Sequence, residues 1–87
     1  MEPLESFSSK QLYRVLELPK HLQVTILALI RKGKACTASE MAQITGKARA
    51  VESSYLNQLV TLKFVKKEHI QGNRRVFFSA DLEALNW

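Results

Sequence analysis

The sequence has few residues that cross-link or interrupt a chain: its 87 residues include one cysteine, two prolines and three glycines. The lone Cys36 excludes an internal disulfide; a small buried apolar residue is its commonest role, and an intermolecular bond or redox sensing is the alternative. The longest purely apolar run, Ile26–Ile30, is far shorter than the ~20 residues of a membrane span. The first ten residues are acidic and polar and lack the pattern of a signal peptide. We therefore expect a cytoplasmic protein with no membrane partner.

Residues that carry catalysis or bind metals are also scarce. The two histidines, His21 and His69, are far apart in the sequence, and neither they nor Cys36 have a second ligand at metal-site spacing. No glycine-rich phosphate loop, nucleophile elbow or Ser/His/Asp pattern occurs. We expect no enzyme activity, no metal or other cofactor, and no small-molecule ligand.

The charge of the chain is concentrated in its middle. The net charge is +5, and residues 19–79 hold 11 of the 13 lysines and arginines but only three of the eight acids. The flanks, 1–18 and 80–87, are each net negative. A basic centre is typical of proteins with a polyanionic partner, most often nucleic acid, although many basic domains bind none.

Local signals predict four helices in the first 62 residues. A capping box with a hydrophobic staple at 7–12 predicts a helix over 8–18, which Pro19 ends. A second helix follows over 19–32, and Gly33 ends it. The same capping pattern at 36–41 predicts a short third helix, 38–45, and a fourth follows Gly46 over 48–62. The residues of the third helix that we expect to be buried are Met41, Ala42 and Ile44.

The periodicity changes after the fourth helix. Residues 64–70 and 75–78 are rich in strand formers and flank a turn at 71–74, which indicates a β-hairpin. Ser79 is then expected to cap a last helix within 80–87. The composition, 46% hydrophobic and 24% charged, suits one globular domain over 1–87. The expected fold is mainly α with a small hairpin, an α+β arrangement.

Residues 20–79 resemble the winged-helix domain of MarR- and ArsR-type prokaryotic transcription regulators. Residues 22–30 are similar to the first core helix of these regulators. TASEMAQITG at 37–46 is similar to their T-x-x-E-L-A-x-x-x-G helix and turn. Residues 55–67 resemble the recognition helix running into the first wing strand, and GNRR at 72–75 lies where the family has its wing tip. The resemblance implies a winged helix-turn-helix with an extra helix at each end.

Three positions depart from the family pattern. Lys47 replaces an apolar residue, and Ala48 replaces the usual Ser or Thr cap of the recognition helix. Glu52 stands at a core position, and we expect its carboxylate to pair with Arg49 or Lys63.

The resemblance implies sequence-specific or semi-specific binding of double-stranded DNA by a small, nucleoid-associated transcription regulator. Helix 48–62 would lie in the major groove, where Asn and Gln pair with adenine and Arg with guanine. The wing at 71–75 would contact the backbone or minor groove. The residues expected at DNA are Lys47, Arg49, Ala50, Ser53, Ser54, Asn57, Gln58, Gln71, Gly72, Asn73, Arg74 and Arg75.

Other roles remain open at this stage. The uncharged polar residues of helix 48–62 equally suit a neutral solvent face, and the same fold serves as a protein–protein module in larger assemblies. RNA binding is weaker, because Phe77 and Phe78 are adjacent and only one could stack a base. We also expect a homodimer, since both flanks carry apolar residues, unless these flanks fold back on the monomer's own core. The expected interface residues are Leu4, Phe7, Leu12, Val15, Leu16, Leu82, Leu85 and Trp87.

Overall fold

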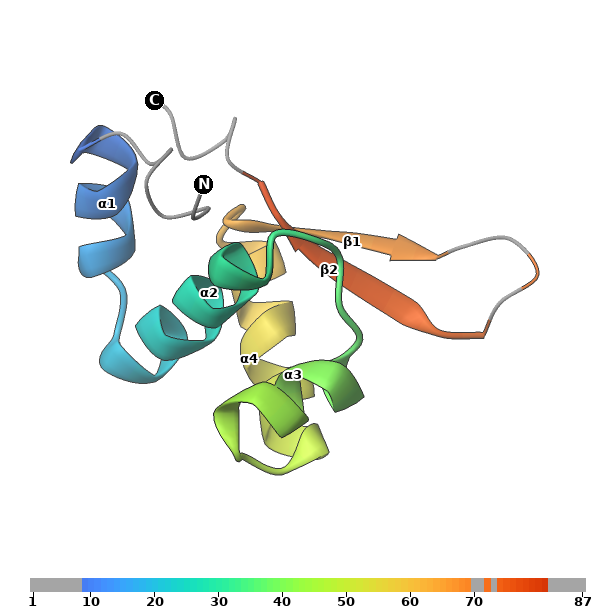
Figure 1. Ribbon diagram of the computed structural model, residues 1–87. Coiled ribbons are helices and arrows are strands. Elements are labelled where there is room, and N and C mark those ends of the chain that lie inside the picture. The colour runs from blue at the N-terminus through green and yellow to red at the C-terminus, as the bar shows by residue number, and fades with distance from the viewer. Residues whose placement is uncertain (1–8, 70–71, 73, 82–87) are drawn as a thin grey trace.

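The computed structural model describes residues 9–69, 72 and 74–81. Within them, four helices precede a two-stranded antiparallel hairpin (Figure 1). The elements are α1 (Ser9–Leu16), α2 (Lys20–Lys32), α3 (Ala38–Thr45), α4 (Arg49–Thr61), β1 (Val65–His69) and β2 (Val76–Ala80). This order confirms the expected fold class, a mainly helical, winged-helix-like α+β fold. No helix of the described residues is long and apolar enough to cross a membrane.

The ends of α2 and α3 form where the sequence signals predict them. Gly33 and Gly46 both take the left-handed conformation, with φ of 74° and 76°, that ends a helix. At the start of α3, the Glu40 N–H donates to Thr37 Oγ1 at 3.1 Å, and the Thr37 N–H donates to Glu40 Oε1 at 2.9 Å. The predicted capping box is therefore confirmed.

The helices predicted at the two ends of the chain lie only partly within the described residues. Helix α1 ends at Leu16, and its expected cap, Ser8, lies outside the described residues. The prediction that Ser79 caps a helix is wrong, because Ser79 pairs with Lys66 and belongs with Ala80 to β2. The rest of the expected last helix, 82–87, lies outside the described residues.

The hairpin is hydrogen-bonded to the loop between α2 and α3 through Cys36. The register of the hairpin pairs Val65 with Ala80 and His69 with Val76. The Cys36 N–H donates to the Phe78 carbonyl at 2.9 Å, and the Phe78 N–H donates to the Cys36 carbonyl at 2.8 Å. The Cys36 side chain is completely buried, and this burial raises the pKa of its thiol. The raised pKa disfavours the thiolate, which is the reactive form of cysteine. Cys36 is thus the small core residue that the sequence predicts.

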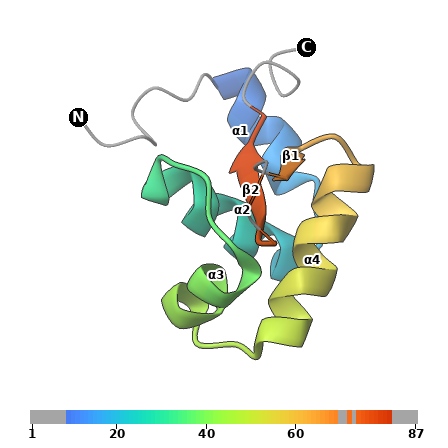
Figure 2. The same ribbon diagram turned by 90° about the vertical axis from the view of Figure 1, so that its right-hand side faces the viewer.

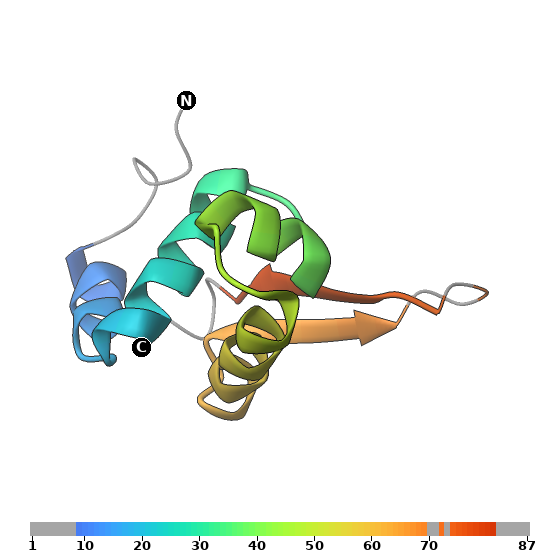
Figure 3. The same ribbon diagram turned by 90° about the horizontal axis from the view of Figure 1, so that it is seen from below.

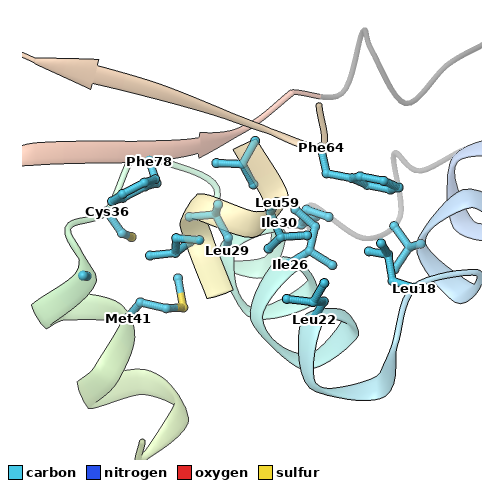
Figure 4. Packing of buried hydrophobic residues seen from close by; sticks show 14 residues of the cluster. Leu18, Leu22, Ile26, Leu29, Ile30, Cys36, Met41, Leu59, Phe64 and Phe78 are labelled. Atoms are coloured by element: carbon cyan, nitrogen blue, oxygen red, sulfur yellow. The ribbon is translucent and has the colours of Figure 1, made fainter. Parts of the chain in front are cut away.

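The core lies where α2, α3 and α4 meet beneath the hairpin (Figure 4). Helix α2 is central because its apolar residues cover much of its circumference. The prediction that Ile44 is buried is wrong, since its side chain is 46% exposed. The inward face of α3 is formed by Ala38, Met41 and Thr45 at helical spacing, and Ile44 falls to one side of it. The fully buried residues at the centre of the core include Ile26, Leu29, Met41, Leu56 and Leu59.

A candidate nucleic-acid interface

Helix α4 and the hairpin border a groove of about 450 Å³. The hairpin extends beyond the helices, and the end at which β1 finishes and β2 begins lies on the side opposite α1 (Figures 1 and 3). Figure 2, which looks along the hairpin from this end, shows α3 and α4 on either side below it. The start of α3 forms the third wall of the groove. The cations that line the groove are Arg49, Lys67, Arg74 and Arg75.

The side of α4 that faces away from the core is the side expected at DNA. The opposite side of α4 carries the buried residues of the helix, Glu52, Leu56 and Leu59. Ser53 and Asn57 are half-buried and line the groove. The exposed residues of the outer face are Arg49, Ala50, Ser54 and Gln58.

The prediction that Glu52 pairs with Arg49 or Lys63 is wrong. Glu52 is 0% exposed, and its carboxylate accepts hydrogen bonds from two hydroxyls on other helices. Thr25 Oγ1 donates to Oε1 at 2.8 Å, and Thr45 Oγ1 donates to Oε2 at 2.6 Å. The reason is helical spacing, which puts Glu52 on the same face as Leu56 and Leu59. The single acid of α4 is therefore turned away from the groove.

Arg49 connects the first turns of α3 and α4. Its Nε donates to Ser39 Oγ at 3.0 Å. Both residues line the groove. The bond holds the guanidinium against the groove wall instead of leaving it as an unattached surface charge.

Asn57 connects α4 to the hairpin. Lys67 Nζ donates to Asn57 Oδ1 at 2.9 Å, and Asn57 Nδ2 donates to the Ser53 carbonyl at 2.8 Å. The ammonium of Lys67 also lies 5.9 Å from the ring centre of Phe78. The other amide of this helix, on Gln58, donates from Nε2 to Ser54 Oγ at 3.3 Å.

Lys67 is a residue of the groove that the sequence analysis missed. It pairs opposite Phe78 in the hairpin and lies two residues after Val65, so all three share one face of the sheet. Phe78 and Val65 are buried against the helices, and Lys67 is therefore directed toward the groove. Alternation along β1, combined with the hairpin register, is the signal that could have found it.

Among the described residues expected at DNA, those that do not line the groove are Lys47, Ala50, Ser54, Gln58 and Gly72. Lys47 has contacts of its own. Its ammonium lies 5.3 Å from the ring centre of Tyr55, whose ring is 4.7 Å from that of His21 on α2. It is not among the residues that line the groove. The structure thus brings Arg49 together with Arg74 and Arg75, but not Lys47.

The wing tip and the expected dimer residues are only partly within the described residues. Gly72 has a φ of 82°, which favours glycine in a turn. Leu12 and Leu16 of α1 are 43% and 53% exposed, whereas Val15 between them is 0% exposed and belongs to the chain's own core. Val15 is therefore not available at a surface. The expected site residues outside the described part are Gln71, Asn73, Leu4, Phe7, Leu82, Leu85 and Trp87.

The fold is winged-helix-like, with α3 and α4 as the two helices of its helix-turn-helix. A cationic groove lies beside the second of these helices, α4. Models of known protein families give no match to the sequence. The chain is 44% identical over 62 residues to an uncharacterized protein of Archaeoglobus fulgidus, and the match covers 71% of this chain and 80% of that protein. The chain belongs to the same family as this archaeal protein.

Proposed function

We propose that the protein binds double-stranded DNA, with α4 in the major groove and the hairpin on the adjacent backbone or minor groove. The observation that carries the proposal is the groove between them, which is lined by Arg49 of α4, Lys67 of β1 and the two arginines just before β2, Arg74 and Arg75. Phosphates supply the negative charge that such a cluster would bind, and they dominate the affinity of proteins for DNA.

The outer face of α4 supports the same function. Ala50, Ser53 and Ser54 are small, so the helix backbone can approach base edges and phosphates closely. The one acid of α4, Glu52, is buried on the opposite side, and Glu40 at the start of α3 is the acid among the residues that line the groove. A helix has the right diameter for the major groove, which is about 12 Å wide. In this role the protein is a small, nucleoid-associated cytoplasmic transcription regulator, similar to the MarR and ArsR groups.

The test is a titration of labelled duplex DNA at several salt concentrations. We expect an affinity that falls steeply with salt, because each phosphate contact releases a counterion. The absence of binding to every duplex would overturn the proposal.

A homodimer is the second part of the proposed function. Leu12, Tyr13 and Leu16 of α1 are exposed, the tyrosine by 69%, and clustered exposed apolar side chains often mark interfaces. A two-fold axis through α1 would present two copies of α4 to major-groove segments about one helical turn apart, or a multiple of it. Self-association without any DNA binding would favour the alternative, a winged helix used for protein contact.

A further inference from the structure

The long polar side chains on the outer face of α4 are already hydrogen-bonded within the chain. Arg49 bonds Ser39, and Gln58 bonds Ser54. The amide of Asn57 is engaged at both of its atoms, by the ammonium of Lys67 and by a helix carbonyl. Arg49 uses only its Nε in its bond to Ser39, so its Nη groups can still donate, whereas Asn57 has both amide atoms engaged.

These bonds bear directly on base reading. An asparagine recognises adenine by presenting its oxygen and its nitrogen to one base edge at the same time. The two bonds of Asn57 use one of its N–H groups and one lone pair of its oxygen, so a base edge would have to compete with Lys67 and the Ser53 carbonyl for the orientation of the amide. Ser53 remains, and Ser54 keeps its hydroxyl proton while it accepts from Gln58. Serine contacts several bases without a strong preference.

The hydrogen bond that Asn57 accepts from Lys67 also fixes the position of the Lys67 ammonium. The ammonium is held between the amide of α4 and the ring of Phe78. From there it lines the groove together with Arg49 and Arg74. A cation fixed in this way is well placed for a phosphate, a contact that positions DNA without reading its sequence.

We propose that the protein recognises duplex DNA through its backbone, with little sequence preference, and that Asn57 is a positioning residue for Lys67 and does not read bases. The inference rests on the proposed DNA binding and names the class of DNA that the groove accepts.

The first experiment measures specificity. Duplexes are selected from a random pool by binding to the full chain, and their affinity is compared with that of unselected duplexes at the same salt concentration. We expect a ratio within about tenfold, against the 10³–10⁷ of sequence-specific proteins. A ratio above about 10³ would overturn this inference and leave the DNA binding intact. Failure to bind any duplex would overturn the proposed function, and this inference with it.

The second experiment tests the role of Asn57. Asn57→Ala and Lys67→Ala should each weaken binding to selected and unselected duplexes by the same factor, and Lys67→Ala should lower the salt slope by about 0.9. Adding Asn57→Ala to Lys67→Ala should have no further effect. A loss confined to selected duplexes, present whether or not Lys67 is intact, would instead assign base reading to Asn57.

A matched control is available on the same strand. Lys66 carries the same charge but lies on the opposite face of β1, where its ammonium is 3.8 Å from Asp81. Lys66→Ala should change the affinity and the slope less than Lys67→Ala does. Equal effects of the two variants would show that Lys67 has no special position. Thermal unfolding checks that each variant is folded.

Discussion

Oε2 of Glu52 lies 2.6 Å from Oγ1 of Thr45, and this bond joins the buried face of α4 to the last turn of α3. The other carboxylate oxygen accepts the hydroxyl of Thr25 on α2 at 2.8 Å. One side chain thus links α2, α3 and α4, of which α3 and α4 line the groove. The hydroxyls of Thr25 and Thr45 supply the hydrogen bonds that the buried carboxylate of Glu52 requires.

The first prediction concerns the stability that this link provides. Glu52→Ala removes two buried hydrogen bonds and leaves a cavity, so we expect it to lower the free energy of unfolding by about 2–4 kcal/mol. Urea denaturation followed by circular dichroism measures the change.

A matched variant separates the carboxylate from the space that it fills. The triple replacement Glu52→Leu, Thr25→Val and Thr45→Val exchanges the whole network for apolar groups of similar size, and we expect it to come within about 1.5 kcal/mol of the natural protein. An unchanged stability of Glu52→Ala alone would show that the link contributes nothing.

Glu52 also shows where the sequence stops being informative. Its core position follows from the resemblance to winged-helix regulators, but its partners do not. Thr25 is 27 residues away in the sequence, and a threonine within a helix does not reveal which element it faces. The nearer cations, Arg49 and Lys63, are the partners that the sequence favours. Both are exposed, because Arg49 lies on the outer face of α4 and Lys63 follows the end of the helix.

The features that were predicted correctly depend on local chemistry. The capping box at Thr37 and the glycine at Gly46 each act within a few residues, so the helix ends follow from the sequence. The exposure of Ile44, the strand at Ser79 and the Lys67–Asn57 bond depend on how distant elements pack. Of the residues that line the groove, Arg49, Ser53 and Asn57 of α4 were among those expected, but Lys67, the strand residue that bonds Asn57, was not.

The second prediction concerns pH. The pKa of Glu40 is lowered, chiefly because its carboxylate accepts the Thr37 N–H. The stability that the charged Glu40 carboxylate adds to the fold is complete above the ordinary glutamate pKa of about 4.3. It is lost as the pH falls through the lower pKa of the folded state. The stability advantage over Glu40→Gln, which keeps an acceptor without the charge, should therefore be constant from neutral pH to about 5 and shrink below it.

Thermal unfolding at a series of pH values measures this difference. Thr37→Ala, which removes the other half of the capping box, should cost about 1 kcal/mol throughout the neutral range. An advantage over Glu40→Gln that grows on acidification would contradict the assignment.

The third prediction concerns the wing. Arg74→Ala combined with Arg75→Ala should weaken DNA binding and lower the slope of log affinity against log salt by up to about 1.8, since each lost phosphate contact contributes about 0.9. The control is Lys20→Ala with Arg31→Ala, which removes the same charge from exposed positions of α2 that do not line the groove. Equal slopes for the two double variants would remove the wing from the interface.

The last prediction concerns the homodimer. The exposed side chains of Leu12 and Leu16 lie on one face of α1, and burying them against a second copy would remove apolar surface from water. We expect sedimentation equilibrium at micromolar concentration to give twice the chain mass of 9.9 kDa. Leu12→Ser with Leu16→Ser should shift the equilibrium to the monomer and weaken binding to DNA, because only one α4 then contacts the duplex.

Ile44→Ser is the control for this double variant, since Ile44 is an exposed apolar residue of α3 and not of α1. It should leave the mass at twice that of the chain. Val15 offers a second contrast: being buried in the monomer, its replacement by alanine should lower the stability of the fold and not specifically the association. A species of 9.9 kDa at every concentration, free and on DNA, would exclude the dimer. The apolar face of α1 would then need an occupant other than a second copy of this chain.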